Sequence, residues 1–197
     1  MIKTIGIIGF GQMGKIFAEI FSDRLEVLVF SRSPICLDAK TLKVNVATIQ
    51  EVCKTDVIVF CLPTESLEQA FKKTLQHLHR DSVILDISSI KEKPARLMTR
   101  IFTEDVALLG THPMFGPNSL QESDEKNIVF CPVRISHSKL EEIERVFRKV
   151  GFTIFRMTPR LHDRKMAHSQ LVTHVLANIM TRLKIRNLEF APLSFRL

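Results

Sequence analysis

Hydrophobic residues along the 197-residue chain occur in two alternating patterns. Short runs rich in β-branched residues predict buried strands, and the stretches between them carry apolar residues at helical spacing. We expect strands at Thr4–Gly9, Glu26–Phe30, Asp56–Cys61, Ser82–Ile87, Val106–Leu109, Asn127–Cys131 and Phe152–Phe155. We expect helices at Met13–Phe21, Glu65–Leu78, Lys91–Ile101 and Lys139–Val150.

Continuously apolar strands that alternate with helices are typical of a parallel sheet covered on both faces. Right-handed crossovers between such strands produce a doubly wound fold. We therefore predict an α/β domain with a doubly wound, Rossmann-like parallel sheet over residues 1–157.

The pattern changes after Phe155, where Thr158-Pro159 interrupts the chain. From Leu161 to about Arg186 it predicts one helix that is longer than the others and apolar on more than one side. Such a helix normally packs against partners. The remaining tail, residues 187–197, is too short to supply those partners within this chain.

The formal net charge is +7, but basic and acidic residues are interleaved. This distribution favours solubility and small anionic ligands over nucleic acid as a partner. No apolar run approaches the roughly 20 residues that span a bilayer. We expect a cytoplasmic protein without a signal peptide, because Ile2 already begins the first strand, or a plastid protein whose transit peptide has been removed.

The four cysteines, Cys36, Cys53, Cys61 and Cys131, form no CxxC pair and lie near no histidine at metal-binding spacing. We therefore predict free thiols in a reducing compartment and no metal site. Cys61 and Cys131 lie in apolar runs and are interpreted as small core residues.

A glycine-rich turn, Gly9-Phe10-Gly11-Gln12-Met13-Gly14, follows the first strand and opens the first helix. In this context GxGxxG predicts a dinucleotide site. The first glycine permits a tight turn, the second lets the backbone approach a pyrophosphate, and the third lets the helix pack closely on the strand. The free N–H groups of the helix N-terminus then face the phosphates.

The residues after the second strand, Ser31-Arg32-Ser33, indicate which cofactor binds. An NAD site usually has an acidic residue here for the ribose 2′-hydroxyl, and this chain has none. Arg32 can pair with a 2′-phosphate, and Ser31 and Ser33 can donate hydrogen bonds to it. We predict NADP rather than NAD, the alternative being that Arg32 is a solvated loop residue.

Leu62, Pro63 and Thr64 follow the strand at Asp56–Cys61 and are assigned to the cofactor site. Cofactor and substrate meet at this edge of a doubly wound sheet. Thr64 is equally suited to line the nicotinamide side or to cap the next helix.

Two further segments, Asp86–Lys91 and Gly110–Pro117, are expected at strand ends on the same edge. In the second, His112 lies between Thr111 and Pro113, where it is well placed to act as a general base or acid. In the long helix, the polar ladder Gln170, His174 and Asn178 needs either a neighbouring helix or a polar ligand, and the pattern favours neither.

These motifs together resemble the prephenate/arogenate dehydrogenase family of tyrosine biosynthesis. The resemblance is carried, in family order, by the glycine turn, Phe30–Ser33, Asp86–Lys91, His112–Pro117, and His162-Asp163 through His174. The segment His112-Pro113-Met114-Phe115-Gly116-Pro117 is the most specific of them, and Ser31-Arg32-Ser33 resembles the NADP-using, arogenate-type branch.

The resemblance implies that His112 is the catalytic base for the ring 4-hydroxyl of prephenate or arogenate, with hydride passing to the nicotinamide and CO2 leaving the ring. It implies that Ser89 hydrogen-bonds to this histidine and orients it. Ser89 and His112 are therefore assigned to both the catalytic and the substrate-binding site, and His174 is assigned to the substrate-binding site. The family's second domain is an all-helical dimerisation and substrate domain of several helices. The resemblance therefore implies that residues 158–197 are the first helix and tail of a truncated form of this domain, and we expect a homodimer if this helix can pair.

Two other interpretations remain open at this point. One is a β-hydroxyacid dehydrogenase-like or imine reductase-like enzyme, which shares the opening fold. The other is a weakly active or non-catalytic NADP-binding remnant of a tyrosine-pathway dehydrogenase.

Overall fold

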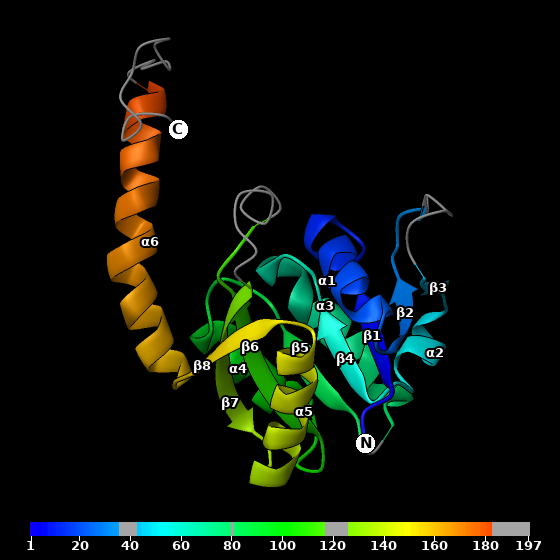
Figure 1. The fold of residues 1–197 in the computed structure, drawn as a ribbon. Helices are drawn as coiled ribbons and strands as arrows, with labels where there is room; N and C mark the ends of the chain where they lie inside the picture. The colour runs from blue at the N-terminus through cyan, green and yellow to red at the C-terminus, as the bar shows by residue number, and fades with distance from the viewer. Residues whose placement is uncertain (36–42, 80, 117–125, 183–197) are drawn as a thin grey trace. The chain divides into compact units, whose positions relative to one another are not determined.

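The computed structural model describes residues 1–35, 43–79, 81–116 and 126–182 (Figure 1). Several side chains of the last helix between Ser169 and Met180, His174 among them, are outside this description. The contacts divide the chain into two compact units, one from Met1 to His162 and one that begins at Asp163.

One mixed sheet forms the centre of the first unit, with its strands in the order β3-β2-β1-β4-β5-β6-β7-β8. The strands are β1 Thr4–Ile8, β2 Glu26–Phe30, β3 Asn45–Val46, β4 Val57–Phe60, β5 Val83–Asp86, β6 Ala107–Pro113, β7 Lys126–Arg134 and β8 Phe152–Arg156. The predicted doubly wound, Rossmann-like fold is confirmed, and every predicted strand is present.

The expectation of a wholly parallel sheet is wrong at one place, because β7 runs antiparallel to β6 and β8 then runs parallel to β7. A parallel connection needs a crossover of a dozen or more residues, usually a helix. The sequence between β6 and β7 carries no helical pattern. The lack of a crossover helix could therefore have predicted that β7 runs antiparallel to β6.

The helices are α1 Gln12–Ser22, α2 Ile49–Val52, α3 Thr64–Thr74, α4 Glu92–Ile101, α5 His137–Lys149 and α6 Pro159–Arg182, with a 3-10 turn η1 at Leu75–His77. Helix α2 and strand β3 were not expected, since both are very short. A capping box marks α2: Thr48 accepts a hydrogen bond from the Glu51 N–H, and the Glu51 carboxylate accepts one from the Thr48 N–H.

Two hydrophobic clusters include many of the fourteen phenylalanines, one on each face of the sheet. Phe21, Phe130 and Phe147 belong to the cluster under α1 and α5, where the rings of Phe21 and Phe147 lie edge to face at 5.0 Å. Phe60 and Phe71 belong to the cluster under α3 and α4, and their ring centroids are 4.7 Å apart. Both faces of the sheet are therefore covered by helices, as Figure 1 shows.

Helix α6 begins at Pro159 and belongs mainly to the second unit. Val175 and Ile179, four residues apart on this helix, are 46% and 47% exposed. Within the described residues, no helix is both long enough and apolar enough to span a membrane.

Candidate functional site

One row of residues crosses the sheet where the parallel strands end. The pairing register aligns Phe30 of β2, Ile8 of β1, Phe60 of β4, Asp86 of β5 and Gly110 of β6. Ligands of doubly wound folds bind beyond this carboxyl edge. The sequence motifs follow the row directly, so the fold brings their backbones to one edge.

The glycine turn has the geometry that each glycine was expected to provide. Gly9 has φ +100°, and a Cβ there would lie 2.4 Å from the carbonyl oxygen of Cys61. A Cβ on Gly14 would lie 2.1 Å from the carbonyl oxygen of Gly9, so only glycine lets α1 approach the turn. A Cβ on Gly11 would meet nothing within 4 Å, which leaves open space beside the N-terminus of α1.

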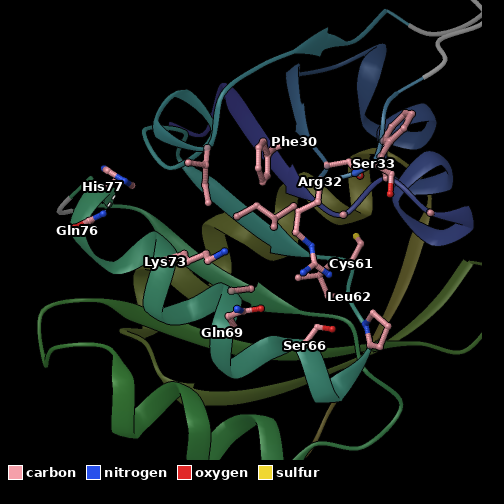
Figure 2. A pocket seen from close by; sticks show the side chains of 18 residues that line it. Phe30, Arg32, Ser33, Cys61, Leu62, Ser66, Gln69, Lys73, Gln76 and His77 are labelled. Carbon is pink, nitrogen blue, oxygen red and sulfur yellow. Dashed lines mark hydrogen bonds between the residues drawn. The ribbon is translucent and has the colours of Figure 1, made fainter.

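A cavity of about 530 Å³ adjoins this turn and is shown in Figure 2. Of the predicted cofactor residues, Gly9, Phe10, Gly11, Ser31, Arg32, Ser33, Leu62 and Pro63 line it. The N-terminus of α1 is at Gly11, and no side chain caps it. Its N–H groups are available to a phosphate, and the cavity is of the size that small-molecule sites have. The residues present therefore fit a dinucleotide.

Three lining side chains are basic or can become so: Arg32, Lys73 and His77. Among the residues that the structure describes, no aspartate or glutamate lines this cavity. In Figure 2, Arg32 reaches from the end of β2 into the cavity, and Lys73 enters from α3. Arg32 also lines a second hollow, together with Ser31, Ser33, Thr48 and the acidic Glu51. The site is thus suited to an anionic ligand.

Four predicted cofactor residues do not line this cavity. Gln12, Met13 and Gly14 form the first turn of α1. Thr64 is the first residue of α3, whose N-cap is Pro63, so the alternative in which Thr64 caps the helix is wrong. Pro63 has an extended backbone, and no side chain caps the N-terminus of α3.

Sequence reasoning missed a polar stripe on α3 and η1. Ser66, Gln69, Lys73 and His77 all line the cavity. Their spacing of three or four residues places them on one helical face. Because the helix was predicted at Glu65–Leu78, this stripe was detectable from the sequence.

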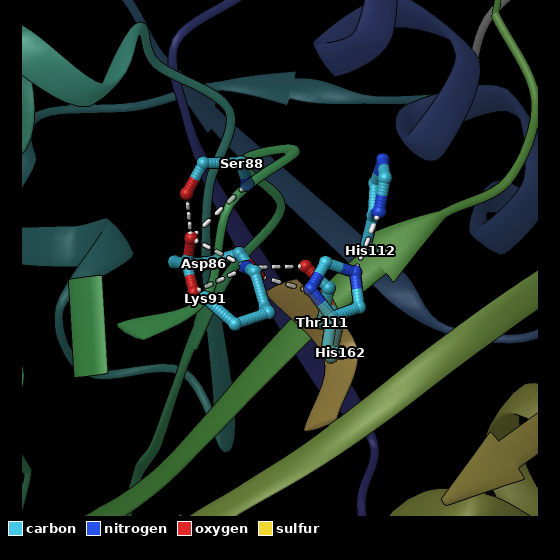
Figure 3. A network of polar contacts seen from close by, with 6 residues as sticks. All are labelled: Asp86, Ser88, Lys91, Thr111, His112 and His162. Atoms are coloured by element: carbon cyan, nitrogen blue, oxygen red, sulfur yellow. Dashed lines mark hydrogen bonds and ion pairs between the residues drawn. The ribbon is translucent and has the colours of Figure 1, made fainter. Parts of the chain in front are cut away.

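A buried polar network lies beyond β5, beside the predicted catalytic histidine (Figure 3). Lys91 Nζ donates to both carboxylate oxygens of Asp86 at 2.8 Å and to the carbonyl oxygen of Thr111 at 2.6 Å. Thr111 Oγ1 donates to the carbonyl oxygen of Asp86 at 2.8 Å, and the Ser88 hydroxyl donates to the Asp86 carboxylate. The network fixes the backbone immediately before His112.

His112 lies within β6 rather than in the loop that was expected after the strand. Residues Thr111–Pro113 extend beyond the end of β5 and pair with β7, where His112 lies opposite Val129. Its side chain is 6% exposed. The antiparallel partner therefore holds the histidine in a rigid strand.

The imidazole of His112 contacts a second imidazole. Nδ1 of His112 lies 2.9 Å from Nε2 of His162, and the ring planes are inclined at 72°. His162 is fully buried in the first turn of α6. Sequence reasoning used His162 only as part of a family motif, because nothing in the pattern placed it beside His112.

Two other predicted site residues are less closely described. Ser89 is an exposed residue between β5 and α4, and its role as the partner of His112 stays a prediction. His174 belongs to α6, and its side chain is outside the described residues, so its substrate-binding role also stays a prediction.

The described cysteines are free thiols. Burial raises the pKa of the Cys53 thiol to about 12, and burial also raises that of Cys61. Cys131 is a buried core residue as expected, whereas Cys61 is only half-buried and lines the cavity. Raised pKa values keep both thiols protonated at neutral pH, so neither is a candidate nucleophile.

A family model described as "Prephenate dehydrogenase, nucleotide-binding domain" matches residues 31–156. The chain belongs to this family. The match, together with the fold, assigns residues 31–156 to a nucleotide-binding domain for a nicotinamide cofactor.

Named relatives agree with this assignment. The chain is 32% identical over 194 residues to "Arogenate dehydrogenase 1, chloroplastic" of Arabidopsis thaliana, covering 92% of this chain and 30% of that protein. A second Arabidopsis arogenate dehydrogenase is 28% identical over 191 residues, covering 90% of this chain and 53% of that protein. The chain thus spans about a third to a half of these relatives.

Solved structures show the same fold. Prephenate dehydrogenase from A. aeolicus, in complex with hydroxyphenyl propionate and NAD+, has a TM-score of 0.76 at 20% identity, covering 100% of this chain and 74% of that one. Synechocystis arogenate dehydrogenase has a TM-score of 0.74 at 18% identity, covering 98% and 76%.

Proposed function

We propose that the chain is the nucleotide-binding and catalytic part of an NADP-dependent dehydrogenase that oxidatively decarboxylates arogenate or prephenate. One observation carries the proposal: an anion-suited cavity and a buried histidine follow the same row at the carboxyl edge of the sheet. Family membership and the names of the relatives support it over the β-hydroxyacid dehydrogenase and imine reductase alternatives.

For the cofactor, we assign the pyrophosphate to the N-terminus of α1 and the 2′-phosphate to Arg32 with Ser31 and Ser33. A guanidinium can bind a phosphate through two parallel hydrogen bonds. Within the described residues, the lining of the cavity beside the glycine turn contains no acidic side chain that would hold a free 2′-hydroxyl and repel a phosphate. Leu62 and Pro63 provide apolar contact along the same wall.

For the reaction, we assign to His112 the role of general base. It takes the proton of the ring 4-hydroxyl, and the bound nicotinamide supplies the hydride acceptor. The substrate carbon thereby becomes a carbonyl. The bond to the ring carboxylate then breaks, CO2 leaves, and its electron pair makes the ring aromatic with a phenolate oxygen, which takes the proton back from His112.

The remaining roles rest on the family resemblance. We propose that Ser89 orients His112, that His174 contacts the substrate, and that residues from 158 onward begin a helical domain that pairs in a homodimer. The exposed Val175 and Ile179 are consistent with such a partner.

A side-by-side assay tests this function. Formation of NADPH would be followed at 340 nm with arogenate and with prephenate, each with NADP and with NAD. We expect turnover with at least one substrate and a preference for NADP. NADPH binding without turnover of either substrate would instead favour the non-catalytic remnant, and equal use of NAD would overturn the cofactor assignment.

A further inference from the structure

We propose that His162 is a positioning residue that fixes the tautomer of His112, with the proton on Nδ1 and the free electron pair on Nε2. The inference rests on the proposed role of His112 as the base. It assigns to the chain a second histidine with a function in the same site.

The two imidazoles are in direct contact. Nδ1 of His112 and Nε2 of His162 are 2.9 Å apart, a normal hydrogen-bond distance, and both rings are buried. Two neutral imidazoles can form this bond only if one nitrogen carries a hydrogen and the other does not. The pair therefore selects between two arrangements of protons.

Backbone hydrogen bonds hold the two histidines in place. Thr111, Phe130 and Arg156 are aligned side by side across β6, β7 and β8. The N–H of Met157 donates to the carbonyl oxygen of Phe130 at 3.0 Å, which anchors the chain just before α6. Thr158 Oγ1 then accepts from the N–H of Leu161 at 3.2 Å and caps the helix. His162 is thus held next to His112 by the sheet.

One of the two proton arrangements is favoured. His162 is in the first turn of α6, where the positive end of the helix dipole disfavours a positive charge. A neutral His162 can accept or donate through Nε2, but both nitrogens of a cationic imidazole carry hydrogen, so the bond survives protonation of His112 only if His162 accepts. This arrangement leaves the hydrogen on Nδ1 of His112. Nε2 of His112 then has the electron pair that a base needs.

The same contact acts during proton transfer. When the substrate hydroxyl gives its proton to Nε2, His112 becomes a cation and keeps the hydrogen on Nδ1. The bond to His162 is then charge-assisted and stronger. His162 neither gains nor loses a proton, and it stabilises the product of the transfer more than the starting state.

The experiment compares two amide replacements in the full chain. The amide of His162→Gln reaches about the position of Nε2, whereas that of His162→Asn reaches only the position of Nδ1. We expect His162→Asn to lower kcat by about 10- to 100-fold, the range seen when a partner of a functional histidine is removed. We expect His162→Gln to lower kcat less than His162→Asn does. KM should stay within about twofold of the wild-type value in both variants. His137→Asn, at an exposed histidine of α5, is the matched control and should have wild-type kcat.

A spectroscopic measurement separates positioning from the proposed function. Nitrogen-15 chemical shifts of the histidine rings report which nitrogen carries hydrogen, independently of turnover. We expect the Nδ1–H form of His112 in the wild type and a mixture in His162→Asn, with NADPH affinity unchanged. An Nε2–H form in the wild type, or shifts unaffected by His162→Asn, would overturn the positioning role. Absence of turnover with the expected shifts would overturn the proposed function alone.

Discussion

Lys91 and Asp86 form a fully buried ion pair, with Nζ 2.8 Å from each carboxylate oxygen and both side chains 0% exposed. Lys91 closes the loop between β5 and α4, and its third hydrogen bond goes to the carbonyl oxygen of Thr111. The pair thus joins the end of β5 to β6 at the residue before the candidate base.

Removal of one partner of this pair should lower the free energy of unfolding more than removal of both partners. Lys91→Met leaves the Asp86 carboxylate buried without its cation, and we expect the free energy of unfolding to fall by about 3–5 kcal/mol. Asp86→Leu combined with Lys91→Met should be less destabilised than Lys91→Met alone, because no unpaired charge remains. Urea unfolding of the single and double variants measures this. A double variant as unstable as the sum of the singles would contradict a coupled pair.

Two glycines of the turn should separate stability from binding. Gly14→Ala places a Cβ 2.1 Å from the Gly9 carbonyl oxygen, so we expect both lower stability and loss of NADPH binding. Gly11→Ala meets no protein atom within 4 Å and should cost at most about 1 kcal/mol through a poorer N-cap. It should nevertheless weaken NADPH, because its Cβ enters the space assigned to the pyrophosphate. Thermal unfolding and fluorescence titration test the two effects, and unchanged NADPH affinity in Gly11→Ala would place the pyrophosphate elsewhere.

Arg32→Ala should change cofactor preference rather than cofactor binding in general. A hydrogen bond to a charged group contributes about 1.5–3 kcal/mol, so we expect the Kd for NADPH to rise about 10- to 100-fold and that for NADH to stay nearly constant. Arg96→Ala, at an exposed arginine of α4 that does not line the cavity, is the control. Equal losses for both cofactors would indicate that Arg32 does not contact the 2′-phosphate.

His112→Asn should keep the nucleotide site and lose the chemistry. We expect an unchanged Kd for NADPH and a kcat lower by about 10²- to 10⁴-fold, the usual contribution of a general base. Stopped-flow measurement of the first turnover distinguishes slow chemistry from slow product release. A variant with nearly wild-type kcat would remove His112 from the mechanism.

Asp56 should make stability depend on acid pH. Burial alone would raise the pKa of its carboxyl, but hydrogen bonds from the N–H groups of Lys3 and Thr4 lower it overall. A pKa lower in the folded than in the unfolded state stabilises the fold above the unfolded pKa, and this stabilisation is lost as pH falls through the folded pKa.

Asp56→Asn should therefore be less stable than the wild type at pH 7, and the difference should shrink towards pH 3. Urea unfolding at both pH values measures it, with the exposed Asp81→Asn as control. A difference between wild type and Asp56→Asn that does not change with pH would show that the carboxylate charge is irrelevant.

The sequence predicted those parts of the site that depend on local chain geometry. The turn from Gly9 to Gly14 and the residues after Phe30 follow their strands directly, so pattern and motif were sufficient. The contact between His112 and His162 was not predictable in this way. It depends on the antiparallel pairing of β6 with β7 and on the pairing of β7 with β8, after which α6 begins. Tertiary pairing of this kind leaves no periodic signal in the sequence.

The position of His162 has a practical consequence for dissecting the molecule. The hydrophobic pattern of the sequence predicted a domain boundary after residue 157, whereas the first compact unit of the structure continues to His162. A chain shortened after residue 157 would retain the strands and the cavity beside the glycine turn, and we expect it to bind the cofactor. It would nevertheless lack the imidazole that faces His112. Excision of the two units for separate study, or exchange of the helical unit between relatives, should therefore be made after His162.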